Sequence, residues 1–125
     1  MYPAIDPATA LKGSASGKVI FLSGASQGIG QATDVAFAQA GAAAVYITAR
    51  SAQALEETQR KVLTANPDTQ CEYRLCDVTD EQQVQAAIGN CVKKFGGIDV
   101  ADANAGYLDK WSKIGESDQE SWWRT

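Results

Sequence analysis

The fold is decided by the stretch Gly17-Lys18-Val19-Ile20-Phe21-Leu22-Ser23-Gly24-Ala25-Ser26-Gln27-Gly28-Ile29-Gly30. Its apolar run, Val19 to Leu22, is typical of a strand that is buried on both faces of a parallel sheet. A glycine turn follows, and then a helical pattern continues to about Ala40, with Gly41 as its stop. The first turn of a helix has free N–H groups and a partial positive charge, so this arrangement suits an anion. The apolar face of the helix is expected to comprise Ile29, Ala32, Ala36, Phe37 and Ala40.

Composition indicates an ordinary globular chain that forms one domain. The chain has 125 residues, of which 45% are hydrophobic and 21% are charged. Its net charge of −4 and its lack of a basic run argue against a nucleic-acid partner. No apolar run approaches the ~20 residues that cross a membrane, and no secretory leader is apparent at the N-terminus. We therefore expect a cytoplasmic protein with no membrane partner.

The cysteine and histidine counts exclude several kinds of chemistry. The three cysteines form no C-x-x-C pair, and Cys71 and Cys76 are expected on one strand about 16 Å apart, too far for a disulfide. The chain has no histidine, which excludes Ser-His and Cys-His nucleophiles and histidine metal sites. No metal site is expected.

The remaining pattern alternates strands and helices. Residues 1–17 lack periodicity and are expected to form a flexible N-terminal arm, and residues 18–125 form the domain. Further strands are expected within 42–49, at 70–76 (an edge strand) and at 98–104. Helices are expected after Ser51, over about 81–95, and after a capping box of Ser117 and Glu120. This order predicts an α/β fold with a parallel sheet.

A glycine turn alone also occurs at ordinary strand-to-helix corners, so the rest of the chain must support a functional interpretation. The segment from Ser23 to Gly30 resembles the cofactor loop of the short-chain dehydrogenase/reductase family, with Ser23 at the usual threonine position. The resemblance implies a Rossmann-like, doubly wound parallel sheet with the strand order 3-2-1-4. It also implies that this loop binds the pyrophosphate and adenine ribose of NAD or NADP, through Gly24, Ser26, Gln27, Gly28, Ile29 and Gly30.

The resemblance continues at the ends of the next strands. In the family, a carboxylate at the end of the second strand selects NAD. Here that position is Ala49, about 20 residues beyond the glycines, and Arg50 follows it. A guanidinium suits the 2′-phosphate of NADP. NADP is therefore favoured, NAD remains possible, and a solvated loop arginine is the alternative. Asp77 and Val78 resemble the pair that contacts the adenine ring, although an aspartate also commonly ends a strand in a turn.

The fourth motif departs from the family pattern. The run Ala103-Asn104-Ala105-Gly106 resembles the family's Asn-Asn-Ala-Gly, in which Asn104 would stabilise the central strands and Ala105 and Gly106 would lie beside the nicotinamide ribose. Ala103 replaces the first asparagine of that pattern. Asp102 stands at a position that is usually apolar, so its carboxylate should have a partner, contact solvent or be protonated.

The resemblance covers residues 18–125 but not the family's catalytic groups. The serine and the Tyr-x-x-x-Lys pair would lie beyond Thr125, and none of Tyr2, Tyr46, Tyr73 and Tyr107 has a lysine four residues later. The resemblance implies hydride transfer between NADP(H) and a carbonyl or alcohol in a longer parent protein, with this chain as the cofactor-binding part, incomplete at its C-terminus and inactive alone. The alternative is a non-catalytic nucleotide-binding or interaction module. An open edge at the fourth strand favours a homo-oligomer.

Overall fold

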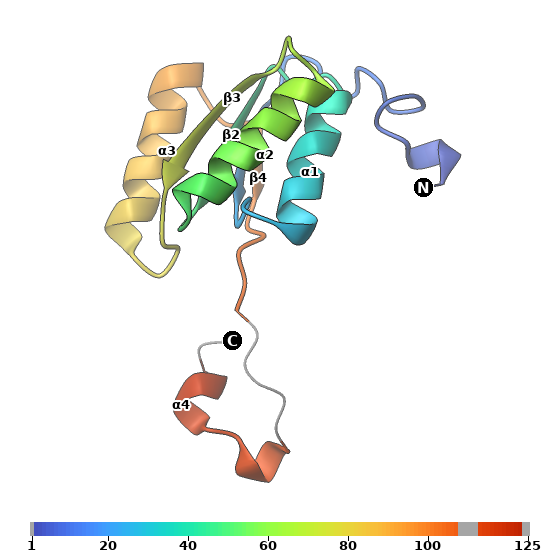
Figure 1. The fold of residues 1–125 in the computed structure, drawn as a ribbon. Helices are drawn as coiled ribbons and strands as arrows, with labels where there is room; N and C mark the ends of the chain where they lie inside the picture. The colour runs from blue at the N-terminus through green and yellow to red at the C-terminus, as the bar shows by residue number, and fades with distance from the viewer. Residues whose placement is uncertain (1, 108–112, 124–125) are drawn as a thin grey trace.

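The computed structural model describes residues 2–107 and 113–123 (Figure 1). Four parallel strands form one sheet in the order β3-β2-β1-β4, as the resemblance implied. The strands are β1 (Val19–Ser23), β2 (Ala44–Ala49), β3 (Gln70–Leu75) and β4 (Val100–Asp102). The α-helices are α1 (Gly28–Gln39), α2 (Ala52–Ala65), α3 (Glu81–Phe95) and α4 (Gln119–Trp122), and two short 3-10 helices are η1 (Pro3–Ile5) and η2 (Ile114–Glu116).

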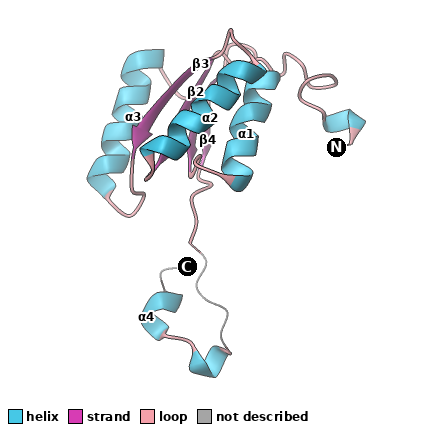
Figure 2. Cartoon of the chain, viewed as in Figure 1, coloured by secondary structure: helices cyan, strands magenta, loops and turns pink. Residues whose placement is uncertain are grey.

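Helices cover both faces of the sheet, which makes the fold a doubly wound α/β fold (Figure 2). Helices α1 and α2 lie side by side over one face (Figure 1). Because side chains alternate along a strand, every second residue of β1 and β2 points into this layer. Its buried core includes Ile20, Leu22, Val45, Ile47, Leu55 and Val62.

The opposite face of the sheet packs against α3. The rings of Phe21 and Tyr46, which are register partners on β1 and β2, stack with their centroids 5.7 Å apart. Phe95 meets the Tyr46 ring edge-on at 6.4 Å. Ala87 and Cys91 of α3 complete this layer, and both are fully buried. All three cysteines of the chain are buried free thiols.

The predicted helix boundaries are largely confirmed. The Ser51 hydroxyl caps α2 by accepting from the Ala54 N–H at 3.4 Å. Gly41 and Gly96 take positive φ angles of 88° and 86° directly after α1 and α3, as C-terminal glycines do. The capping box before α4 is wrong. Asp118 caps that helix by accepting from the Ser121 N–H at 3.0 Å, whereas the Ser117 hydroxyl donates to the Lys113 carbonyl at 3.1 Å.

Two other expectations differ from the structure. The apolar face predicted for α1 is only partly right. Ala40 is buried and Phe37 packs against the core, but Ile29 is 81% exposed and Ala32 is exposed, while Asp34 and Ala38 are buried. An alanine-rich helix has too little contrast between its faces for the sequence to orient it. The fourth strand is shorter than expected, because its ladder with β1 spans Val100–Asp102 and the residues that follow turn toward the β1–α1 loop.

Part of the predicted N-terminal arm contacts the domain. Ala15 is buried, and its N–H donates to the Ala40 carbonyl at 3.1 Å. Ser16 forms an isolated antiparallel bridge with Ala42. The flexibility of residues 1–17 stays a prediction. Within the described ranges, no helix is both long and apolar enough to cross a bilayer.

Candidate functional site

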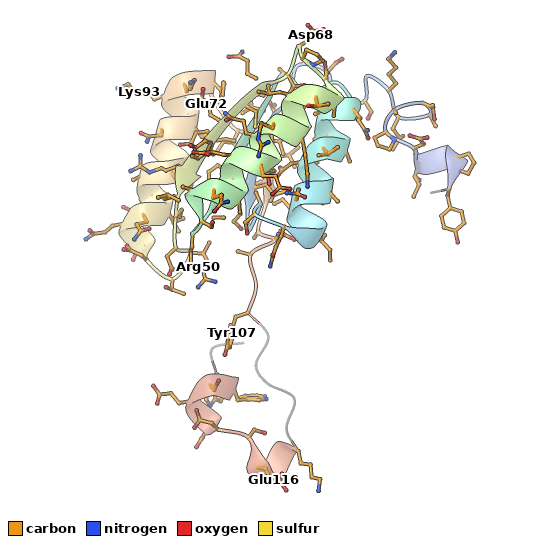
Figure 3. The ribbon with its side chains drawn as sticks, viewed as in Figure 1. Arg50, Asp68, Glu72, Lys93, Tyr107 and Glu116 are labelled. Atoms are coloured by element: carbon orange, nitrogen blue, oxygen red, sulfur yellow. The ribbon has the colours of Figure 1, made fainter. Side chains whose placement is uncertain are left out.

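The predicted site residues follow the carboxyl ends of the four strands, which all meet at one end of a parallel sheet. Figure 3 shows Arg50 at this end of the sheet, from which the chain also leaves toward Tyr107. The site therefore consists of the turn between β1 and α1, the residue after β2, the loop after β3 and the segment after β4. These segments are Gly24–Gly30, Arg50, Asp77–Val78 and Asn104–Gly106.

The turn between β1 and α1 is held by hydrogen bonds from neighbouring elements. The N–H groups of Gly24 and Ala25 both donate to the carbonyl of Thr48 on β2, at 2.9 and 3.1 Å. From the other side, the Asn104 side-chain amide donates to the carbonyls of Ser23 and Gly24, at 3.0 and 3.2 Å. The turn is therefore held in place by β2 on one side and by the segment after β4 on the other.

Close packing explains two of the three glycines in the turn. A Cβ atom on Gly24 would lie 2.8 Å from the Cα of Ala105. A Cβ on Gly30 would lie 2.5 Å from both the Asn104 side-chain nitrogen and the Gly24 carbonyl oxygen. These distances leave no room for a methyl group, so the segment after β4 can approach the turn and the first turn of α1 only without side chains at these positions.

The third glycine faces open space. Gly28 has a φ of +59°, and no atom lies within 4 Å of the position that its Cβ would occupy. Gln27 and Ile29 beside it are exposed. Ser26, the remaining predicted residue of this turn, is half-buried. The side of the turn that faces away from the sheet is therefore open to a ligand.

The N-terminus of α1 has no side-chain cap. Among the α-helices of the described chain, α2, α3 and α4 are each capped by a side-chain oxygen, from Ser51, Asp80 and Asp118. The residue before α1 is Gln27, which makes no capping hydrogen bond, and the first turn of α1 holds no acidic residue. The N–H groups in the first turn of α1, and the partial positive charge there, are therefore available to bind an anion.

Arg50 and Asp77 lie close enough to interact electrostatically. Two hydrogen bonds from Thr79, from its N–H at 3.0 Å and its hydroxyl at 2.8 Å, are the main reason that the pKa of Asp77 lies below its ordinary value. The positive charge of Arg50 lowers this pKa further. Arg50 is exposed, and Val78 beside Asp77 is 47% exposed. The ends of β2 and β3 thus combine a cation, a carboxylate and an apolar side chain.

The segment after β4 is held against β1 by Ser23. The Ala105 N–H donates to the Ser23 hydroxyl at 3.2 Å, and that hydroxyl lies 3.5 Å from the Asp102 carbonyl oxygen. The side chain of Asp102 is half-buried, which agrees with the expectation that this carboxylate is not enclosed without solvent. Ala105 is half-buried and Gly106 is exposed, so this segment borders the open side of the turn.

Several residues that shape the site were not predicted. Thr48 on β2, Thr58 on α2 and Gln31 on α1 all hydrogen-bond to the turn or to its supports. These contacts join residues that are far apart in sequence, and no spacing rule signals them. Among the described residues, no three Cys, Asp or Glu side chains are grouped so that they could hold a metal ion.

Comparison with known proteins identifies the family. A family model for short chain dehydrogenases matches residues 18–125. The chain belongs to the short-chain dehydrogenase family. This short-chain dehydrogenase sequence is 41% identical, over 129 residues, to the short chain dehydrogenase mpl6 of Monascus purpureus; the alignment covers 99% of the chain and 42% of the relative. It is 38% identical to the short chain dehydrogenase tazN of Aspergillus terreus, covering 98% of the chain and 26% of that protein.

Solved structures share the fold of this short-chain dehydrogenase chain. An NAD⁺-bound xylitol dehydrogenase matches with a TM-score of 0.82 and 29% identity, over 88% of the chain and 41% of that protein. L-Sorbose reductase from Gluconobacter frateurii, in complex with NADPH and L-sorbose, matches with a TM-score of 0.76 and 32% identity, over 86% of this chain and 40% of that protein. The chain thus spans less than half the length of these relatives, which include both an NAD⁺ and an NADPH complex.

Proposed function

We propose that this chain is the NADP(H)-binding part of a short-chain oxidoreductase that transfers hydride between NADP(H) and a carbonyl or alcohol. The observation that carries the proposal is the uncapped N-terminus of α1, beside a glycine turn that is open on its outer side. Phosphate groups bind at such helix ends through backbone N–H groups. The residues present fit a dinucleotide, because the neighbouring strand ends add a cation, a carboxylate and small residues.

Each part of the cofactor has a proposed partner in the chain. The pyrophosphate would lie at Gly24–Gly30, with the exposed Ile29 covered by the bound cofactor. The adenine would lie against Asp77 and Val78, and the nicotinamide ribose beside the segment from Asn104 to Gly106. When bound, the nicotinamide donates or accepts the hydride, and the residues of this chain bind and orient it.

Arg50 is the basis for proposing NADP rather than NAD. Its exposed guanidinium lies at the end of β2, where it can form charge-assisted hydrogen bonds to a 2′-phosphate. The nearby Asp77 carboxylate balances part of that charge in the absence of cofactor. The structural relatives include complexes with either cofactor, so the preference for NADP depends on this one side chain.

The direct experiment is calorimetric titration of the 125-residue chain with NADPH and NADH. We expect NADPH to bind roughly ten- to a hundredfold more tightly, because a charged hydrogen bond contributes about 1.5–3 kcal/mol. Arg50→Ala should remove most of this difference. Arg60→Ala is the matched control, because Arg60 is an exposed arginine on α2, in the shallow cleft between α1 and α2. Equal affinities for the two cofactors would contradict the NADP assignment. If neither NADPH nor NADH bound, the proposed cofactor site would be contradicted.

Hydride transfer is proposed for a longer protein, because the chain covers 42% of its relative from Monascus purpureus. None of the four tyrosines of the chain has a lysine four residues later. We therefore expect the 125-residue chain to bind NADPH without oxidising it in the presence of ketones or aldehydes. Steady NADPH oxidation by protein of verified mass would contradict this expectation. The cytoplasmic location stays a prediction.

A further inference from the structure

A chain of side-chain hydrogen bonds connects the surface of α2 with the cofactor turn. The Lys61 ammonium group, which pairs with Glu57 at 2.8 Å, donates to the Gln31 side-chain oxygen at 2.7 Å. The Gln31 side-chain amide donates to the Thr58 hydroxyl at 2.9 Å. The Thr58 hydroxyl lies 2.8 Å from the carbonyl oxygen of Ala25 in the turn. The connection therefore runs from two exposed charges to the backbone between β1 and α1.

Thr58 is the central member of this chain of hydrogen bonds. Threonines inside helices often donate to the carbonyl four residues earlier, and the Ala54 carbonyl oxygen lies 3.1 Å away. The hydroxyl has one proton, however, and its oxygen already accepts from Gln31. The Ala25 carbonyl is the nearer acceptor. Because Thr58 is fully buried, its hydroxyl needs these partners, and they orient it toward the turn.

The carbonyl of Ala25 determines where the next N–H points. The peptide unit is planar and trans, so the Ala25 carbonyl and the Ser26 N–H lie in one rigid plane and point in opposite directions. A hydroxyl that holds this carbonyl toward α2 directs the Ser26 N–H away from α2. Thr48 on β2 accepts from the Gly24 and Ala25 N–H groups, and Asn104 after β4 donates to the Ser23 and Gly24 carbonyls. Of these hydrogen bonds, only the one from Thr58 goes to the Ala25 carbonyl.

We propose that Thr58 is a positioning residue for the dinucleotide: its hydroxyl, supported by Gln31, fixes the Ala25–Ser26 peptide and so orients the turn that receives the pyrophosphate. This inference rests on the proposed function for its ligand, but the ordering of the turn does not depend on any ligand. Thr58 is fully buried and hydrogen-bonds to the Ala25 carbonyl, so it acts through the turn.

The test compares three variants of the 125-residue chain. Thr58→Val keeps the shape of the side chain but removes the hydroxyl, and Thr58→Ser keeps the hydroxyl. Thr64→Val is the matched control, because Thr64 lies on the same helix, is exposed, and donates to the Arg60 carbonyl at 2.7 Å. Two quantities are measured for each: the dissociation constant for NADPH, and the hydrogen-exchange rates of the amides from Ala25 to Gly30 in cofactor-free protein.

We expect Thr58→Val to weaken NADPH binding about tenfold, the effect of losing one hydrogen bond, and to speed amide exchange in the turn. Thr58→Ser and Thr64→Val should match the parent in both measurements. Amide exchange rates in Thr58→Val equal to those of the parent would overturn the proposal. If the parent binds NADPH, an unchanged affinity of Thr58→Val for NADPH would also overturn it. A parent that binds no cofactor would refute the proposed function, and the exchange rates alone would then decide the role of Thr58.

A further variant, Gln31→Met, covers the case in which Thr58→Val does not fold. Gln31→Met removes the amide that donates to the Thr58 hydroxyl, at a half-buried position on α1. The freed hydroxyl can then turn to the Ala54 carbonyl. We expect faster exchange from Ala25 to Gly30 and weaker NADPH binding in this variant. The same rates and affinity as in the parent would overturn the proposal.

Discussion

Asp34 is a carboxylic acid inside the apolar layer between α1 and the sheet. Its side chain is fully buried, and within the described part of the chain neither of its oxygens has a hydrogen-bond partner. Burial, and then the negative charge of Asp102, raise its pKa from 3.8 to about 8. On the same face of the sheet, burial and the charge of Asp34 raise the pKa of the Cys71 thiol to about 12. We therefore expect Asp34 to be largely protonated in the folded chain at neutral pH.

This protonation makes folding stability depend on pH. The folded chain keeps the Asp34 proton up to a pKa of about 8, whereas the unfolded chain releases it near 3.8. Between these values the free energy of unfolding should fall as the pH rises, by about 1.4 kcal/mol for each pH unit from this group alone. Asp34→Asn, which cannot ionise, should lose this slope. Denaturant unfolding at pH 5, 6, 7 and 8 measures it.

The control for this experiment is Asp68→Asn. Asp68 is an exposed aspartate in the turn between α2 and β3 (Figure 3), so this variant should keep the pH dependence of the parent chain. The comparison uses slopes and not absolute stabilities, because a buried asparagine amide also needs partners. Parallel slopes for Asp34→Asn and the parent chain would show that Asp34 is already ionised when folded.

At the scale of elements, the periodic patterns predicted the type and order of the secondary structure. The apolar run of β1, the helical spacing of α3 and the glycines that end α1 and α3 depend on neighbours in sequence, and these local rules held. The buried face of α1 followed only at its C-terminal end, at Phe37 and Ala40, because alanines give a helix little preference between faces. The length of β4 depends on its pairing with β1, which local pattern does not contain.

In the candidate site, too, the features that depend on local sequence were predicted and those that depend on tertiary contacts were not. The positions of the turn, Arg50, Asp77 and Asn104 at strand ends followed from the motif and the parallel topology. What the sequence could not supply is the contact of Asn104 with Gly30, or the bond from Thr58 to the turn. Both join elements through the tertiary fold. Cofactor binding by these residues stays a prediction.

Two helical glycines give a matched test of how α1 meets the segment after β4. A methyl group on Gly30 would meet Asn104 and the Gly24 carbonyl at 2.5 Å, so Gly30→Ala should destabilise the chain by about 1–3 kcal/mol, the usual cost of overpacking. Gly89 lies within α3 and is exposed, with nothing within 4 Å of its Cβ position. Gly89→Ala should therefore stabilise the chain by about 0.5–1 kcal/mol.

Thermal and denaturant unfolding of both variants measures these opposite signs. A neutral Gly30→Ala would mean that Asn104 and the turn separate easily, which contradicts the tight packing of the first turn of α1 against Asn104. A destabilising Gly89→Ala would mean that α3 needs its glycine for a contact that the described chain does not contain.

At the scale of the whole molecule, the described chain leaves apolar surface uncovered. Strand β4 is an edge of the sheet, with Ala101 exposed on it. In the C-terminal segment, Trp122 and Trp123 are 58% and 73% exposed and contact each other edge-on, with ring centroids 4.9 Å apart. An unpaired strand edge and exposed large aromatics both favour association.

We therefore expect the 125-residue chain to form dimers or larger assemblies, through the edge of β4 and the Trp122–Trp123 segment. Ala101→Lys places a charge on the strand edge and should shift the chain toward monomer. Ala43→Lys, at an exposed position before β2, adds the same charge away from that edge and should not. Light scattering across a concentration series measures the mass, and a monomeric parent at high concentration would refute this expectation.

We propose that a dinucleotide lies across the carboxyl ends of all four strands. Amide chemical shifts of the ¹⁵N-labelled chain during titration with NADPH would locate it. We expect the largest changes at Gly24–Gly30, Arg50, Asp77–Val78 and Asn104–Gly106. Changes confined to the basic surface of Arg74, Lys93 and Lys94, which border a shallow cleft beside α3, would contradict it, as would the absence of any change.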